Sequence, residues 1–343
     1  MRAACGFSAQ VLEIDPARTA QHLESRIRES VFRELRRKGA VLGLSGGIDS
    51  SVAAALCVRA LGPERVLGLL MPEVESSEDS LRLSRDLAAS LGIRTVLEDI
   101  TPILGAAGCY ERRDAAIRQV IPEYGPGFKS KIVLPRALDE PGYALYDVVV
   151  QSPAGVETRA RLTAEAYLGI VAATSFKQRV RKMVEYYHAD RLRYAVVGTP
   201  NRLEYEQGFF VKNGDGAADL KPLAHLYKSQ VYQLGRHLGI PEEIERRVPT
   251  TDTYSSPQSQ EEFYFALRLD TMDLCLYGAN HGVPAAEVAA ATGLTVERVE
   301  QAYRFIEGQR NAARYLHRQP LLVEDLSEGP YPGRPACLAG GAV

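Results

Sequence analysis

Short continuous runs of hydrophobic residues alternate along this chain with segments whose hydrophobic residues recur at helical spacing. The continuous runs have the length of buried strands and occupy residues 40–45, 65–72, 93–100 and 194–199. Helical patterns fill much of the chain between them, most clearly at residues 78–92 and 162–190. Strands that alternate with helices in this way predict an α/β fold with a doubly wound, mainly parallel sheet.

Helical patterns also precede and follow this alternation. Residues 15–39 read as a helix with Asp15 as its cap, and a largely helical C-terminal part is predicted over about 260–320. The spacing at residues 285–305 is that of a helix-turn-helix, but helix pairs are common and the chain has no basic excess, so DNA binding is not favoured. We expect one domain over residues 1–343.

A segment rich in Gly, Pro and Tyr interrupts the alternation at about residues 105–162. Two strand-like runs within it, at 143–151 and 156–162, flank the sequence Ser-Pro-Ala-Gly. Gly and Pro between two such runs are typical of a turn. The segment is therefore predicted to be an insertion that carries an added hairpin.

Charge and composition exclude several classes of protein. The 343 residues hold 41 Lys and Arg against 43 Asp and Glu, a net charge of −2, so no overall basic excess points to nucleic acid or membrane surfaces. No apolar run reaches the roughly 18 residues that a membrane span needs, and the first residues do not resemble a secretory signal, so we expect a cytoplasmic protein. The five cysteines are widely spaced without a Cys-x-x-Cys pair, which argues against a disulfide framework or a zinc site.

The strongest candidate for chemistry lies where the first buried strand gives way to a helix. Its sequence is Ser45-Gly46-Gly47-Ile48-Asp49-Ser50-Ser51. Two glycines allow a tight turn, and the exposed amides and positive end of the following helix favour a phosphate. No lysine follows in the pattern of the P-loop of kinases and GTPases. Asp49 would repel a phosphate unless a divalent cation lay between them, so it predicts Mg²⁺ bound together with a nucleotide.

At these residues the chain resembles the PP-loop ATP pyrophosphatases, which have an adenine nucleotide alpha hydrolase-like fold and split ATP between its α- and β-phosphates. A second set of motifs narrows the resemblance. In order, they are K-x-R-x-R from Lys177, V-G-T-x-x-x-x-E ending at Glu204, G-F-F-x-K-x-G-D-G-x-A-D over 208–219, L-x-K-x-Q around Lys228, and P-T-x-D from Pro249. Together they are similar to NAD synthetases of the ammonia-dependent type, from about residue 20 to residue 320.

Charged residues in these motifs suit the chemistry of such an enzyme. Glu204 follows a strand at the edge where ligands bind in open α/β sheets, so it can complete a Mg²⁺ site with Asp49. Arg179 and Lys228 can neutralise phosphate charge as pyrophosphate departs. A further cluster on a Gly-rich loop can hold a substrate ring and its reacting carboxylate, and it consists of Lys212, Asp215 and Asp219.

The resemblance implies roles for other residues as well. It assigns Lys212, Asp215 and Lys228 to catalysis. It assigns to nucleotide and substrate binding the loop Ser45 to Ser51 with Arg179, Thr199, Asp219, Lys228, Thr250, His317 and Arg318, the last two in a basic tail that closes over phosphates. Its metal ligands are Asp49 and Glu204.

The implied activity is ATP-dependent amide formation. ATP adenylates the nicotinate carboxylate of deamido-NAD, and ammonia displaces AMP to give NAD. The stretch before Ser45 holds a single helix, too little for a glutaminase domain, so free ammonia or a separate glutaminase is the expected nitrogen source. The resemblance also implies a homodimer. No nucleic acid or membrane partner is expected.

Departures from the family pattern keep alternatives open. Where many members read T-D-H-A-A-E, this chain reads T-P-N-R-L-E over 199–204, and the segment at 105–162 replaces a shorter connection. One alternative is a related amidotransferase that amidates a different carboxylate with ammonia from a separate glutaminase. Another is a nucleotide-binding regulator without turnover, although the retained charged set argues against it. The insertion is either a surface hairpin or an element that reshapes the acceptor pocket or the dimer contact.

Overall fold

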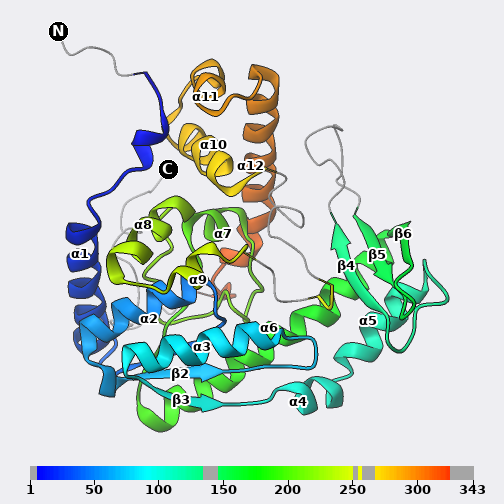
Figure 1. Cartoon of the computed structure of the whole chain (residues 1–343), viewed down its shortest axis with the longest axis horizontal. Helices are drawn as coiled ribbons and strands as arrows, with labels where there is room; N and C mark the ends of the chain where they lie inside the picture. Colours follow the sequence, from blue (N-terminus) through cyan, green and yellow to red (C-terminus); the bar gives the residue numbers. More distant parts are fainter. Residues whose placement is uncertain (1–5, 134–145, 250–253, 257–266, 325–343) are drawn as a thin grey trace.

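The fold centres on a parallel sheet that follows the predicted alternation of strand and helix. The computed structural model describes residues 6–133, 146–249, 254–256 and 267–324 (Figure 1). Within these residues one sheet has four parallel strands in the order β3-β2-β1-β7. Its strands are β1 (Ala40–Gly43), β2 (Val66–Leu70), β3 (Arg94–Leu97) and β7 (Ala195–Val196). The predicted α/β fold with a mainly parallel sheet is confirmed.

Side chains of β1 alternate between two hydrophobic cores, because successive side chains of a strand point to opposite faces of the sheet. Ala40 and Leu42 belong to a core with α1, α2, α3 and α8, whereas Val41 belongs to a core with α4, α5 and α6. Burial on both faces explains why this strand is a continuous apolar run. The helices are α1 (Pro16–Glu29), α2 (Ile48–Leu61), α3 (Glu78–Leu91), α4 (Thr101–Ala106), α5 (Cys109–Arg118), α6 (Ala164–Leu192) and α8 (Lys228–Leu238).

The first long helix begins as predicted but ends early. Asp15 caps α1 by accepting a hydrogen bond from the Arg18 amide at 3.0 Å. The α-helix stops at Glu29 and continues only as a π-helical turn over Ser30–Glu34, so the predicted end at Gly39 is wrong. The backbone then turns through Arg36 at a φ of +53°, which leads the chain into β1.

Strand β7 is much shorter than the hydrophobic run at residues 194–199 predicts. The Asp219 carboxylate accepts the amide of Val196 at 2.8 Å, and Val197 forms an isolated bridge with Leu220. These contacts join the outer edge of β7 to the segment at Asp219 and Leu220. The Val197 amide still donates to the Val41 carbonyl oxygen of β1 at 2.9 Å, and the chain then delivers the next residues to the carboxyl edge of the sheet.

The C-terminal helices form a separate layer with its own hydrophobic core. The predicted helical C-terminal part is therefore confirmed from Leu269 onward. The first residues of that prediction lie within 257–266, outside the described residues. Cys275, Val288 and Ile306 are buried in this core, together with Leu203 and Tyr227 from the elements beside the site. The elements are α7 (Arg202–Gln207), α9 (Glu242–Arg246), α10 (Leu269–His281), α11 (Ala285–Thr292) and α12 (Val296–His317). None of the helices in the described part of the chain is both long and apolar enough to span a membrane.

The insertion contains more structure than the predicted hairpin. Strands β5 (Asp147–Gln151) and β6 (Glu157–Arg161) pair antiparallel, as predicted, and a third strand that was not predicted, β4 (Lys129–Val133), pairs with β5. Helix α5, also within the predicted insertion, packs along α6 rather than forming an irregular loop. Figure 1 shows the small sheet at the right of the molecule, next to α5 and apart from the main-sheet strands β2 and β3. We refer to β4, β5 and β6 as the added sheet.

Candidate active site

The predicted phosphate loop forms a tight turn between β1 and α2. Gly46 has a φ of +70°, which favours glycine, and a side chain there would approach the Ser80 carbonyl oxygen to 2.8 Å. The hydroxyls of Ser50 and Ser51 donate to the carbonyl oxygen of Gly47 at 3.0 and 2.8 Å. Gly47 is the N-cap of α2, and among the residues that the structure describes no side chain caps this helix. Its first amides can therefore bind an anion at the positive end of the helix by donating hydrogen bonds to it.

The two predicted carboxylates meet at the carboxyl edge of the sheet. Asp49 lies in the first turn of α2 after β1, and Glu204 lies in α7 after the neighbouring strand β7. Asn201 connects them, because its Nδ2 donates to Asp49 Oδ1 at 3.1 Å while its Oδ1 accepts the Glu204 amide at 3.1 Å. The Asn201 amide in turn donates to Glu204 Oε2 at 3.2 Å. A single buried asparagine thus sets the positions of both carboxylates.

Lys228 supplies positive charge next to this pair. Its ammonium forms an ion pair with Asp49, and its side chain is only 2% exposed. Burial opposes the charged form, but the carboxylates of Asp49 and Glu204 outweigh it and hold the pKa of Lys228 above its ordinary value. Asp273 in α10 accepts the backbone amides of Lys228 and Ser229 at 3.3 and 2.7 Å. This contact fixes the start of α8 and therefore the origin of the lysine side chain.

These groups line a cavity of about 340 Å³. Its other walls come from α6, from the loops at residues 208–211 and 247–249, and from Tyr146 and Tyr254. The predicted residues that line it are Ser45, Gly47, Ile48, Asp49, Ser50, Thr199, Glu204, Asp215 and Lys228. Its aromatic wall consists of Tyr146, Tyr167, Phe209, Phe210 and Tyr254. The cavity therefore combines an anion-binding turn, a charged group of three side chains and flat apolar surface.

A second cavity of about 220 Å³ shares Ser45, Ser50, Thr199 and Asp215 with the first. It extends from the phosphate loop to the ends of β1 and β2 and to α6, where Lys182 and Glu185 form a buried ion pair. Burial raises the pKa of both Glu185 and Asp215, against the opposing influence of the Lys182 ammonium. Two connected cavities on one loop suit two ligands that react with each other.

Arg247 is a basic residue at the site that the sequence patterns did not single out. Its guanidinium donates to the carbonyl oxygens of Ser45 and Gly46 at 3.4 and 3.3 Å, and to Ser80 Oγ at 2.6 Å. It therefore ties the phosphate loop to α3 while lining the first cavity. Asn201 was missed as well. Asn201 lies within the V-G-T-x-x-x-x-E motif, and Arg247 lies two residues before the P-T-x-D motif. These positions beside recognised motifs are the only signal that the sequence carries for the two residues.

Several predicted residues lie outside the lining of the two cavities. Lys212 donates to the Tyr315 carbonyl oxygen at 2.9 Å, and the Arg179 guanidinium donates to the Lys212 carbonyl oxygen at 3.3 Å. Asp219 holds the end of β7, as described above. His317 approaches the Tyr205 carbonyl oxygen at 3.0 Å, and the exposed Arg318 follows it at the end of α12. Gly46 and Ser51 shape the phosphate loop from within, and Thr250 lies outside the described residues.

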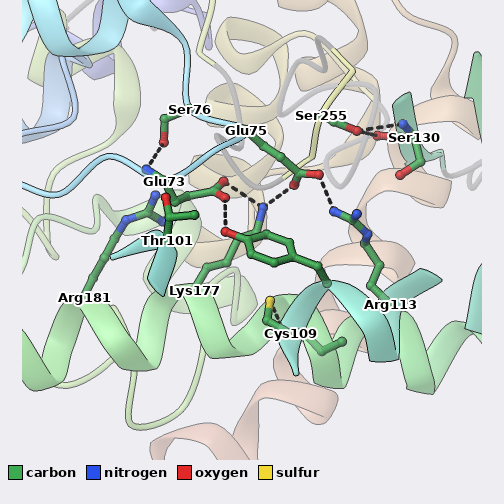
Figure 2. A network of polar contacts seen from close by, with 12 residues as sticks. Glu73, Glu75, Ser76, Thr101, Cys109, Arg113, Ser130, Lys177, Arg181 and Ser255 are labelled. Carbon is green, nitrogen blue, oxygen red and sulfur yellow. Dashed lines mark hydrogen bonds and ion pairs between the residues drawn. The ribbon is translucent and has the colours of Figure 1, made fainter. Parts of the chain in front are cut away.

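A buried charged network fixes the segment after β2, which also borders the second cavity. Figure 2 shows Lys177 of α6 between Glu73 and Glu75, at 2.8 and 2.5 Å from their carboxylate oxygens. Arg113 pairs with Glu75 from α5, and the Tyr110 hydroxyl donates to Glu73 at 2.8 Å. Lys177 is fully buried. The first lysine of the K-x-R-x-R motif is therefore a structural anchor that joins three elements.

The two carboxylates fit a magnesium ion by the chemistry of their donors. Mg²⁺ prefers oxygen ligands, and in proteins it is commonly bound by one or two carboxylates together with substrate phosphates. Asp49 and Glu204 provide such a pair next to the turn that favours a phosphate. In the described part of the chain no group of three or more His, Cys, Asp or Glu side chains forms a metal site, so this pair would need the phosphates to complete its ligand set.

Comparison with known proteins identifies the family. A family model described as NAD synthase matches residues 19–119 and 155–314. The NH(3)-dependent NAD(+) synthetase of Rhizobium meliloti (strain 1021) is 58% identical over 322 residues, which cover 94% of this chain and 96% of that protein. The enzyme of the same name from Thermotoga neapolitana is 34% identical over 292 residues, which cover 84% of this chain and 93% of that protein.

Solved structures agree at the level of the fold. The NH3-dependent NAD synthetase from Campylobacter jejuni superposes with a TM-score of 0.59 at 22% identity, covering 91% of this chain and 100% of that one. An NMN synthetase from Francisella tularensis gives a TM-score of 0.61 at 23% identity, covering 90% and 99%. Because the family model spans most of the sequence and the R. meliloti relative aligns along almost all of it, this chain belongs to the NAD synthase family.

Proposed function

We propose that this protein is an ammonia-dependent NAD synthetase, which converts deamido-NAD, ammonia and ATP to NAD, AMP and pyrophosphate. The observation that carries the proposal is the 58% identity to an NH(3)-dependent NAD(+) synthetase along nearly the full length of both chains. The site supports it independently, because Asp49, Glu204 and Lys228 meet beside an anion-binding turn in a cavity large enough for a nucleotide.

The reaction has two steps that balance without a covalent enzyme intermediate. An oxygen of the nicotinate carboxylate attacks the α-phosphorus of ATP, and the bond to the β-phosphate breaks to release pyrophosphate. Ammonia then attacks the acyl carbon of the adenylate, AMP leaves with the former carboxylate oxygen, and loss of a proton gives the amide. The chain contributes by positioning the reactants, neutralising charge and shielding the adenylate from water.

Individual residues have distinct parts in these steps. The amides at the start of α2 hold phosphate oxygens, and Ser45 and Ser50 line the turn between the two cavities. Lys228 keeps its charge at neutral pH, because its carboxylate neighbours raise its pKa, so it can stabilise negative charge on the phosphates. Asp49 and Glu204 would hold Mg²⁺, which when bound would neutralise charge on the departing pyrophosphate.

Other assignments in this proposal stay predictions. Arg179, Lys212, Asp219, Thr250, His317 and Arg318 are predicted to contact ATP or the acceptor, and Arg179 and Lys212 would need to turn from their present partners to do so. A homodimer is also predicted, and sedimentation of the purified protein at micromolar concentration tests it.

The proposed function is tested by incubating the purified protein with ATP, MgCl₂ and deamido-NAD, with either ammonium or glutamine as the nitrogen source. We expect NAD and equimolar AMP with ammonium, and little NAD with glutamine alone. Nicotinate mononucleotide serves as a second acceptor that shares the carboxylate but lacks the adenylate half. Pyrophosphate release that requires a carboxylate other than deamido-NAD would overturn the assignment in favour of a related amidotransferase.

A further inference from the structure

The added sheet lies at the candidate active site although the family model does not match most of it. Matched residues end at 119 and resume at 155, so β4 and β5 lie wholly in the unmatched stretch. The sheet is not loosely attached. Ile132 and Val148 are buried against Ile117 of α5 and Ile170 of α6, in a core shared by these elements. A wall built from the added sheet is therefore held as firmly as the helices behind it.

Tyr146 lies at the end of the added sheet and lines the first cavity. It directly precedes β5, and its carbonyl oxygen accepts the Leu162 amide at 3.0 Å, which closes the end of the β5–β6 ladder. Its ring stacks on that of Tyr167 in the first turn of α6, with centroids 4.6 Å apart and planes inclined by 15°. Both rings line the cavity that contains the phosphate loop and Lys228.

A second connection places another tyrosine in the same wall. The Ser130 amide in β4 donates to Ser255 Oγ at 2.8 Å, and the Ser256 amide donates to the Ser130 carbonyl oxygen at 3.2 Å. Figure 2 shows Ser130 and Ser255 facing each other. This contact holds Tyr254 in the core of the added sheet, where it is 8% exposed and also lines the cavity.

Three tyrosines from three segments thus line the same cavity as Asp49, Glu204 and Lys228, and two of them stack on each other. Burial raises the pKa of Tyr167 and of Tyr254, so both phenols stay neutral at physiological pH. A neutral aromatic wall brings no positive charge to the phosphates of a nucleotide, but it suits a flat ring, which gains both apolar contact and stacking. The stack of Tyr146 on Tyr167 fixes the plane against which such a ring would lie.

We propose that Tyr146 is a specificity-determining residue, which stacks a heteroaromatic ring of the dinucleotide acceptor in this cavity. The proposal rests on the proposed function and deepens it, because it assigns the aromatic wall to the acceptor rather than to ATP. The acceptor carries a nicotinate ring and an adenine ring, and either one can supply the stacking chemistry. The added sheet is then part of the acceptor site, not a surface hairpin.

The kinetic test compares Tyr146→Ala and Tyr146→Phe with a control on the same sheet. Val156→Ala is that control, since Val156 lies at the β5–β6 turn, is 62% exposed and does not line the cavity. We expect Tyr146→Ala to raise KM for deamido-NAD about tenfold, roughly what removing one stacked aromatic ring does to base binding, with KM for ATP within about twofold of wild type. Tyr146→Phe and Val156→Ala should leave both constants near wild type.

A binding test avoids dependence on turnover. The chain has no tryptophan, so Tyr146→Trp introduces a single tryptophan at the wall, which is excited selectively over the tyrosines, and Val156→Trp places one at the far turn. Deamido-NAD should quench Tyr146→Trp but not Val156→Trp. Quenching by nicotinate mononucleotide identifies the nicotinate ring as the stacking partner, and quenching by ADP-ribose identifies the adenine ring.

The outcomes separate the two proposals. The inference would be overturned, with the proposed function left standing, by an unchanged KM for deamido-NAD in Tyr146→Ala. It would also be overturned if ATP quenched Tyr146→Trp and deamido-NAD did not. A wild-type protein that releases no pyrophosphate in the presence of deamido-NAD would overturn the proposed function itself. If Tyr146→Ala does not fold, the Tyr146→Trp titration decides.

Discussion

Replacing Lys228 with methionine tests the charged group at the centre of the site. Methionine keeps most of the apolar volume of the side chain and removes the ammonium that pairs with Asp49. Asp49 then retains its hydrogen bond from Asn201 but loses its counter-charge next to Glu204. Removing one partner of a buried ion pair commonly destabilises a protein by about 3–5 kcal/mol, since the remaining charge stays desolvated.

The expected size of this effect follows from the exposure of the two partners. The Lys228 side chain is 2% exposed and that of Asp49 is 17% exposed, so water partly screens the carboxylate and the lower figure of about 3 kcal/mol applies. Unfolding entropy near 2.1 cal/mol/K per residue gives about 0.7 kcal/mol/K for a chain of 343 residues. The melting temperature should therefore fall by about 4 °C.

Thermal unfolding with and without MgCl₂ provides the assay. If Asp49 and Glu204 are metal ligands, Mg²⁺ should raise the melting temperature of Lys228→Met more than that of wild type, because no ammonium competes for the site. The double variant Lys228→Met, Glu204→Gln should lose this response. Lys38→Met, at an exposed lysine remote from the cavities, controls for the loss of one positive charge and should melt like wild type. A Lys228→Met protein as stable as wild type, or one indifferent to Mg²⁺, would refute the reasoning.

Three further predictions concern residues around the same group. Asp49→Asn and Glu204→Gln should each lower pyrophosphate release about a hundredfold while the far-ultraviolet circular dichroism stays native, and near-wild-type turnover would remove the proposed metal site. Gly46→Ala should abolish turnover because its Cβ would meet the Ser80 carbonyl oxygen, whereas Gly92→Ala, at a φ of +66° with open space around it, should lose only about 1–2 kcal/mol of stability and keep its turnover. Burial raises the pKa of Asp273 to about 6, against about 3.9 in the unfolded chain, so its stabilising contribution is complete below about pH 4 and is lost as the pH rises through about 6. Wild type should therefore lose about 3 kcal/mol relative to Asp273→Asn between about pH 3 and about pH 8 in urea titrations, and a constant difference would contradict the shifted pKa.

The alternation of strands and helices and the placement of the acid pair were predictable because local signals fix them. Continuous apolar runs mark strands that are buried on both faces, and residues after neighbouring parallel strands must meet at one edge. Asp49 and Glu204 follow this rule directly. The strand at 194–199 was overestimated because a continuous apolar run does not show where a strand leaves its neighbour, and Val197 already bridges to Leu220 of a loop.

Side-chain direction within loops was not predictable. Lys212 lies in a charged, Gly-rich motif, yet its ammonium contacts α12 rather than a cavity. Conversely, Asn201 and Arg247 gain their roles only when distant segments close around the phosphate loop. Such contacts depend on tertiary packing, and the nearby motifs in the sequence do not show which partners these side chains reach.

The added sheet shows the same limit on a larger scale. The hairpin at 143–162 could be recognised from its two strand-like runs and its turn, whereas β4 follows a Gly- and Pro-rich stretch and has β5 as its strand partner in the described part of the chain. Tyr146 reads as one aromatic residue among many until the fold brings it beside Tyr167 in the cavity wall.

The central claim, that this site activates a carboxylate by adenylation, is tested most directly by following one atom. Deamido-NAD labelled with heavy oxygen in its nicotinate carboxylate is turned over with ATP, MgCl₂ and ammonium, and the products are analysed by mass spectrometry. The account predicts one heavy oxygen in AMP for each NAD formed and none in pyrophosphate. Heavy oxygen in pyrophosphate or inorganic phosphate, or NAD formed without labelled AMP, would contradict it.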